Sequence, residues 1–154
     1  MSGKHIMLSY QRDNQELVGQ VFDKLIAQNI EVWMDIRGGM RPNMWQALAE
    51  GIENAAAICC FLTPRYQTSE YCLRELQYAI DQKVLVIPCR LCSNWKPTGA
   101  LGFLTAGLLW IDFRDKAEHP IDTAIRELID HVQMHVYDRE PVFFPGMLIH
   151  RVKT

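Results

Sequence analysis

The chain has 154 residues, of which 49% are apolar and 22% are charged, and its formal net charge is -2. A chain of this size can bury a hydrophobic core without disulfides or metals, and its composition excludes a disordered or fibrous protein. Because the Lys and Arg residues are scattered rather than clustered in a basic stripe, we expect one globular domain that does not bind nucleic acid.

Short apolar runs alternate with segments of helical period from one end of the chain to the other. The runs are nearly all apolar, which is typical of parallel strands that are covered on both faces. This alternation predicts an α/β protein with five strands. In chain order, the strands are expected at residues 6–10, 30–34, 56–62, 84–89 and 108–111.

The segments between the strands carry apolar residues at helical spacing. Asp13 and Glu16 have the spacing of a capping box ahead of the first helix, and Asn43 and Gln46 repeat it before the second. Residues 93–107 contain one proline and three glycines, so only a short or irregular helix is expected there. Regular helices are expected at residues 17–26, 45–52, 69–82 and 121–132.

Right-handed crossovers between these strands predict a flavodoxin-like, doubly wound five-stranded parallel sheet in the order 2-1-3-4-5, with helices on both faces. Ligands of such sheets bind beyond the carboxyl ends of the strands, which directs attention to the loops that begin at Ser9, Asp35 and Thr63. The first loop lacks the G-x-G-x-x-G of a Rossmann dehydrogenase. Ser9-Tyr10 and Thr63-Pro64 stand where a phosphoreceiver of this topology would need acidic residues.

Cysteine usage and the N-terminus bear on the cellular compartment. Cys59 and Cys60 lie in an apolar run, where they are expected to be small buried hydrophobes. Cys89 and Cys92 form a C-x-x-C, but zinc needs four ligands, and the redox version of this motif usually opens a helix after a strand, whereas Ser-Asn-Trp-Lys-Pro follows here. No metal site is therefore expected. The longest apolar runs are strand-sized and residues 1–4 have no apolar segment for secretion, so we expect a cytoplasmic chain without a membrane segment.

Three sequence boxes resemble those of TIR (Toll/interleukin-1 receptor) domains. Residues 6–10, Ile-Met-Leu-Ser-Tyr, resemble the first box, and Val-Trp-Met-Asp at residues 32–35, followed by a Gly-rich loop, resembles the second. Residues 69–76 resemble the third-helix segment, which most often reads Trp-Cys-x-x-Glu-Leu. The resemblance implies a TIR domain at residues 1–137, with residues 138–154 as a C-terminal strap or linker.

Some TIR domains are signalling scaffolds of innate-immune receptors, and others cleave NAD+. The resemblance implies that Glu75 matches the catalytic glutamate of the enzymes. Tyr71 and Glu75 are four residues apart, so they lie about 40° apart on one helix face, beside its apolar stripe. This placement predicts Glu75 at the rim of a cleft, where a carboxylate can stabilise the oxocarbenium-like charge of a breaking nicotinamide-ribose bond.

Other residues near the strand ends are candidates for substrate binding. Arg12 matches a basic residue of the animal axon-degeneration enzyme, and it suits either a ribose or phosphate contact or a surface salt bridge. Tyr71 replaces the family's Trp, and both it and Trp45 suit either stacking on a base or packing. Trp33 and Trp110 are expected to be packing residues. The expected substrate-binding set is Arg12, Tyr10, Tyr71, Trp45, Ser9 and Asp35.

Residues 35–43 correspond to the BB loop of TIR domains, and their glycines permit the backbone movement of a gate or an assembly contact. An ordinary strand-to-helix loop is the alternative. In the family, the BB loop of one protomer completes the site of the next. The expected assembly residues are Gly38, Gly39, Met40, Arg41 and Pro42.

The resemblance therefore predicts an NAD+ glycohydrolase that acts on self-association in immune or cell-death signalling. It would release nicotinamide and a linear or cyclic ADP-ribose, with NAD+ as the substrate and no cofactor. One alternative is a noncatalytic adaptor that uses the same loop for TIR-TIR contact. A second is a nucleoside deoxyribosyltransferase, which has a related α/β fold and also uses a glutamate at a ribose.

Overall fold

The structure, a computed structural model, describes residues 4–34 and 44–136. Its five strands form one parallel sheet in the order β2-β1-β3-β4-β5, which confirms the predicted topology. The strands are β1 (His5–Ser9), β2 (Val32–Trp33), β3 (Ala55–Leu62), β4 (Leu85–Arg90) and β5 (Ile111–Asp112).

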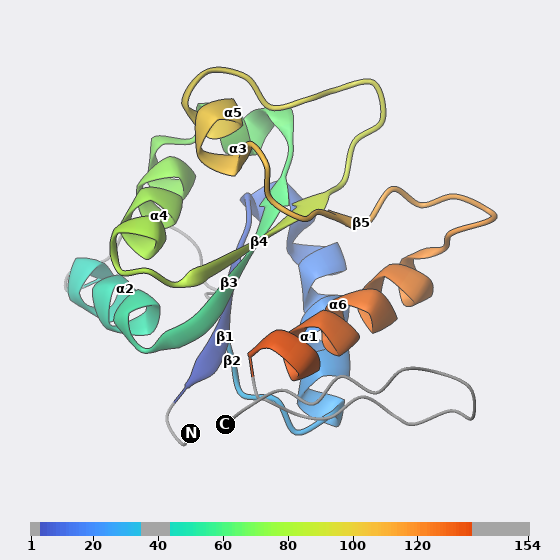
Figure 1. Cartoon of the computed structure of the whole chain (residues 1–154), viewed down its shortest axis with the longest axis horizontal. Helices are drawn as coiled ribbons and strands as arrows, with labels where there is room; N and C mark the ends of the chain where they lie inside the picture. The colour runs from blue at the N-terminus through green and yellow to red at the C-terminus, as the bar shows by residue number, and fades with distance from the viewer. Residues whose placement is uncertain (1–3, 35–43, 137–154) are drawn as a thin grey trace.

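Helices cover both faces of this sheet. Figure 1 shows α1 and α6 packed on one face, with α2 and α4 on the other. Because successive residues of a strand point to opposite faces, Ile6 and Leu8 join the buried layer beneath α1 and α6, whereas Met7 joins the layer beneath α2 and α4. The helices are η1 (Arg12–Asn14), α1 (Gln15–Ala27), α2 (Met44–Glu53), α3 (Pro64–Thr68), α4 (Glu70–Asp81), α5 (Gly99–Thr105) and α6 (Ile121–His135).

The central strand β3 is almost completely buried between its neighbours β1 and β4. Cys59 faces one helical layer and Cys60 the other, and both thiols are free. Burial raises the pKa of the Cys60 thiol to about 12, so the thiol stays neutral. The two cysteines are therefore small core residues, as predicted.

Two local predictions at the ends of elements were wrong. The strand expected at 108–111 begins only at Ile111, and Leu109 in the expected range is 69% exposed. The apolar residues before Ile111 lie where the chain is still returning from α5 to the edge of the sheet, so they have no strand to pair with. The predicted capping box also fails, because Asp13 pairs with Arg65, and Asn14, the N-cap of α1, makes no side-chain capping bond.

The region around α5 agrees with its prediction, since residues 93–107 hold one short helix. The helix α3 was not predicted. It begins with Thr63 as the N-cap and Pro64 at the first helical position, a pair that favours helix starts. None of the helices in the described ranges is long and apolar enough to cross a membrane.

Candidate functional site

A cleft of about 190 Å³ lies between α2 and α4, the two helices that cover the second face of the sheet. Its floor is apolar, and the one carboxylate among its described lining residues is that of Glu75, near the carboxyl end of β1. The lining residues are Trp45, Leu48, Ala49, Ile52, Tyr71, Arg74, Glu75 and Tyr78.

Glu75 lies on the buried stripe of α4. The helix is capped by Ser69, whose side chain accepts a hydrogen bond from the Cys72 backbone N at 3.2 Å. Glu75 and Leu76 follow Cys72 by three and four residues, which is the spacing of residues on one helix face. Glu75 is accordingly only 8% exposed. The sequence placed it at the rim beside this stripe, whereas the helix packs it inward against β1.

Two buried hydroxyl groups lie in series behind the carboxylate, and the nearer one bonds to it. The Oγ of Ser9 donates to the Oε1 of Glu75 at 2.7 Å and lies 2.8 Å from the Tyr66 hydroxyl oxygen. A serine hydroxyl has a single hydrogen, so when it donates to Glu75 it accepts from the Tyr66 hydroxyl at 2.8 Å, and the backbone carbonyl oxygen of Cys72, at 3.4 Å, is a more distant second acceptor for the same phenol. Burial raises the pKa of the Tyr66 phenol well above its usual value, which keeps that proton in place. The relay therefore runs from Tyr66 through Ser9 to Glu75.

Tyr66 was missed by the sequence reasoning because it lies in the unexpected helix α3. The Thr63 side chain accepts a hydrogen bond from the Tyr66 backbone N at 3.1 Å and so fixes the first turn. The Tyr66 side chain is fully buried among the layer beneath α2 and α4. The Thr-Pro pair at the start of this helix was the available signal.

Aromatic rings and a cation flank the opening of the cleft. Trp45 is 51% exposed, and its ring centroid lies 6.2 Å from that of Tyr71, with the planes tilted by 39°. The Arg74 guanidinium lies 5.4 Å from the Trp45 ring centroid and pairs with Glu70 at 3.0 Å. The opening thus presents flat apolar faces beside a buried carboxylate.

The structure brings only some of the predicted site residues to this cleft. Glu75, Tyr71 and Trp45 line it, and Ser9 contacts Glu75 from behind while being only 1% exposed itself. Tyr10 packs against the opposite layer, beneath α1 and α6. Arg12 is exposed in η1, outside the set that lines the cleft. Asp35 and the expected assembly residues 38–42 lie outside the described residues.

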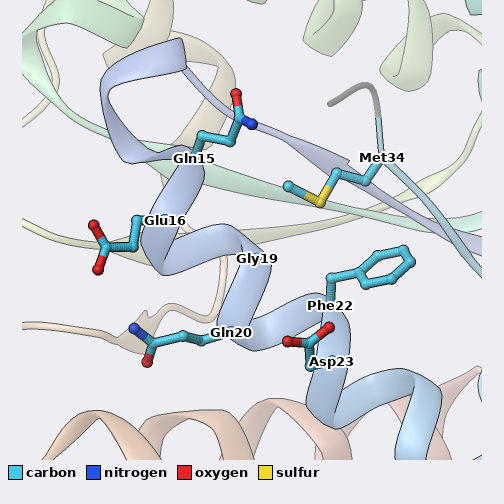
Figure 2. Close-up of a pocket in the computed structure, with 7 residues that line it drawn as sticks. All are labelled: Gln15, Glu16, Gly19, Gln20, Phe22, Asp23 and Met34. Atoms are coloured by element: carbon cyan, nitrogen blue, oxygen red, sulfur yellow. The ribbon is translucent and has the colours of Figure 1, made fainter. Parts of the chain in front are cut away.

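A second hollow runs along the outer side of α1, with a volume of about 540 Å³. Figure 2 shows that the Glu16 carboxylate and the Gln20 amide point to the opposite side of the helix from the Phe22 ring and the Met34 side chain. Ligand sites need polar groups that converge. This groove therefore offers no comparable site, and in the described ranges no three His, Cys, Asp or Glu residues cluster as metal ligands.

Comparison with solved structures relates the whole arrangement to TIR domains. The TIR domains in a structure of the activated Roq1 resistosome, which recognises the pathogen effector XopQ, share 19% identity at a TM-score of 0.68, over 84% of this chain and 99% of theirs. The TIR domain of the Toll-related receptor TRR-2 from Hydra magnipapillata shares 19% identity at a TM-score of 0.63, over 83% of this chain and 97% of that domain.

A TIR-STING receptor from C. gigas, solved in complex with 2',3'-cGAMP, shares 16% identity at a TM-score of 0.58 over 80% of this chain and 38% of that one. No curated protein sequence matches the chain. The family model of the TIR domain matches residues 6–129, which include all of the sheet except His5, the first residue of β1, and all of the α2–α4 cleft. The chain belongs to the TIR domain family.

Proposed function

We propose that this TIR domain cleaves NAD+ at the nicotinamide-ribose bond, with Glu75 as the catalytic residue. The observation that carries the proposal is the buried relay from Tyr66 through Ser9, which orients one oxygen of the Glu75 carboxylate in the wall of an apolar cleft. A buried carboxylate is costly unless it is hydrogen-bonded. Such an arrangement suits a charge that must be aimed at a substrate rather than one that stabilises the fold.

The bond between C1 of the ribose and the nicotinamide nitrogen breaks with its electron pair leaving on the nitrogen. Nicotinamide departs as a neutral molecule, so no second acid is needed. The positive charge that develops on the ribose is stabilised by the Glu75 carboxylate, whose low exposure strengthens the interaction. Attack by water, which loses a proton, gives ADP-ribose, and attack by the adenine of the same molecule gives a cyclic product.

The cleft fits one end of this substrate. Its volume of about 190 Å³ is below the range of roughly 300–1,000 Å³ that holds a whole drug-sized ligand. The nicotinamide riboside end would occupy it, with the nicotinamide ring against the faces of Trp45 and Tyr71. The diphosphate and adenosine would extend out of the opening, past Arg74.

We infer that the domain self-associates and acts in the cytoplasm in immune or cell-death signalling. The likeness to the TIR domains of a resistosome and of a Toll-related receptor supports this part of the proposal. An assembly that completes the substrate site would make specific activity rise with protein concentration. The competing proposal is an adaptor that associates in the same way without cleaving NAD+.

The decisive experiment compares the parent with Glu75→Gln over a series of protein concentrations, with nicotinamide release measured by chromatography. Glutamine keeps the size of the side chain and an oxygen for Ser9 but removes the charge. We expect the rate to fall on the order of 100-fold or more. Asp81→Asn, an exposed carboxylate on the same helix, is the matched control and should keep the parent rate.

The outcomes separate the two proposals. If Glu75→Gln cleaves NAD+ as fast as the parent, the proposed mechanism is wrong. If the parent releases no nicotinamide at any concentration at which it self-associates, the adaptor proposal replaces it. Because Glu75 is buried, the variant should lose about 1 kcal/mol of unfolding free energy, more than an exposed position would lose.

A further inference from the structure

A separate pocket of about 440 Å³ lies beyond the carboxyl end of β4, beside α5. It is formed by the loop that leaves β4 and by the segment that returns from α5 to β5 (Figure 1). Its lining shares no residue with the α2–α4 cleft. The principal lining side chains are Arg90, Trp95, Lys96, Pro97 and Trp110.

The charge in this pocket is wholly positive. Arg90 and Lys96 are its only ionisable lining residues, and within the described residues neither has a carboxylate in salt-bridge range. Asp112 is the register partner of Arg90 across the β4–β5 ladder, but its two carboxylate oxygens bond to the Arg114 guanidinium at 2.8 Å each. Among the residues that the structure describes, neither cation therefore has a counter-ion.

Flat apolar walls stand beside these cations. Trp95 and Trp110 are half-buried and pack against the core layer beneath α2 and α4. Trp110 is a packing residue, as predicted, but it precedes β5 instead of lying within the strand, and it also lines the pocket. Indole faces held by a core are suited to stacking on a planar ring.

The loop that carries Trp95 and Lys96 is held in place before any ligand arrives. Gln67 of α3 accepts a hydrogen bond from the Thr98 backbone N at 2.8 Å and donates to the Thr98 hydroxyl at 3.0 Å. Gly102 of α5 packs so closely that a Cβ there would lie 2.8 Å from the Pro97 carbonyl oxygen. A preformed site reduces the ordering cost of binding.

We propose that this pocket binds a nucleotide, with the base stacked on a tryptophan face and the phosphate held by Arg90 and Lys96. The volume lies within the usual range for small-ligand sites. Guanidinium and ammonium groups are the side chains that bind phosphate, and aromatic faces bind bases regardless of identity. The site is independent of NAD+ cleavage at Glu75, since it uses other elements and holds no carboxylate.

The test is a titration of the purified chain with ADP, followed by calorimetry and tryptophan fluorescence. We expect saturable binding of one ADP at this pocket, about ten-fold weaker binding by Lys96→Met, and no change in Lys24→Met, an exposed lysine on α1. Adenosine and ribose 5-phosphate should each bind at least about ten-fold more weakly than ADP, because each lacks one half of the recognised chemistry.

Trp45→Leu and Trp110→Leu distinguish the two clefts. Loss of ADP binding in Trp110→Leu with retention in Trp45→Leu supports the pocket beyond β4. The reverse pattern places ADP in the α2–α4 cleft and overturns the proposal, whether or not NAD+ is cleaved. Binding of ribose 5-phosphate as tight as that of ADP also overturns the proposal, since the site would then recognise only the phosphate and not the base. If Trp110→Leu fails to fold, Lys96→Met still tests the proposal, because Lys96 is exposed and its substitution should not affect folding. An affinity of Lys96→Met for ADP equal to that of the parent would contradict the proposal.

Discussion

The α2–α4 cleft holds a buried carboxylate that two hydroxyls orient, whereas the pocket beyond β4 holds two cations and two indole faces without a carboxylate. Both lie against the same core layer. In the first, the carboxyl group is removed from water and held by internal hydrogen bonds. In the second, the Arg90 side chain is half-buried and that of Lys96 is exposed, and neither has a carboxylate partner in residues 4–34 and 44–136.

The difference supports the two proposals, a reaction at the first site and ligand binding at the second. A buried and aimed charge is worth most where charge develops in a transition state, because no solvent has to reorganise. Partly solvated cations give long-range attraction and an adaptable grip on a phosphate, with less directional control. Three predictions examine this comparison by disabling the relay, the loop of the second pocket, and the ion pair that leaves Arg90 available.

The largest effect is expected from Ser9→Ala. It removes the donor to Glu75 and leaves the Tyr66 hydroxyl facing a methyl group. Because a misplaced catalytic group commonly costs about 100-fold in rate, kcat for NAD+ cleavage should fall by that order while KM changes little. Steady-state kinetics with Ser93→Ala, an exposed serine, as the control would measure this. A change confined to KM would return Ser9 to the substrate-binding role predicted from the sequence.

An intermediate effect is expected from Gly102→Ala. The added Cβ would meet two backbone atoms of Pro97 at 2.8 and 3.1 Å, so the loop or α5 must shift. Overpacking of this kind costs about 1–3 kcal/mol of unfolding free energy, and ADP binding should weaken while NAD+ cleavage is retained. Urea unfolding measures the loss of stability, and calorimetry measures the affinity for ADP.

The control for that variant is Gly19→Ala, where an added Cβ would find no atom within 4 Å. Since Gly19 lies inside α1, alanine there should stabilise the chain slightly through helix propensity. Equal stability of Gly102→Ala and its parent would show that the loop is not held tightly, and the preformed second pocket would lose its support.

The smallest effect is expected from Asp112→Asn, read as a change in pH dependence. Hydrogen bonds from Arg114 lower the pKa of the Asp112 carboxyl well below its usual value. A lowered folded-state pKa stabilises the fold above the unfolded value of about 4, and this contribution is lost as the pH falls toward the folded value. The melting temperature of the parent should therefore drop more steeply below about pH 4 than that of Asp112→Asn. If the melting temperatures of the two chains fall equally with decreasing pH, the lowered pKa of Asp112 is contradicted.

Local pattern was sufficient for much of the fold. The apolar runs that became β1, β3 and β4 and the helical periods of α1, α4 and α6 depend on residues near in sequence, which is why their prediction succeeded. Prediction failed where position relative to the sheet decides the structure. Leu108 and Leu109 resemble the start of a strand, but β5 pairs with β4 only from Ile111 onward.

By itself the sequence determined the parallel α/β architecture, the strand order and the membership in the TIR family, because periodicity and short motifs are written in neighbouring residues. It also singled out Glu75. Only the tertiary structure decided that this carboxylate is buried and bonded to Ser9, which lies 66 positions earlier in the chain. The same holds for the contact between Ser9 and Tyr66, which are 57 positions apart. Hydrogen bonds between distant residues depend on how helices seat on the sheet, and no local pattern encodes that distance.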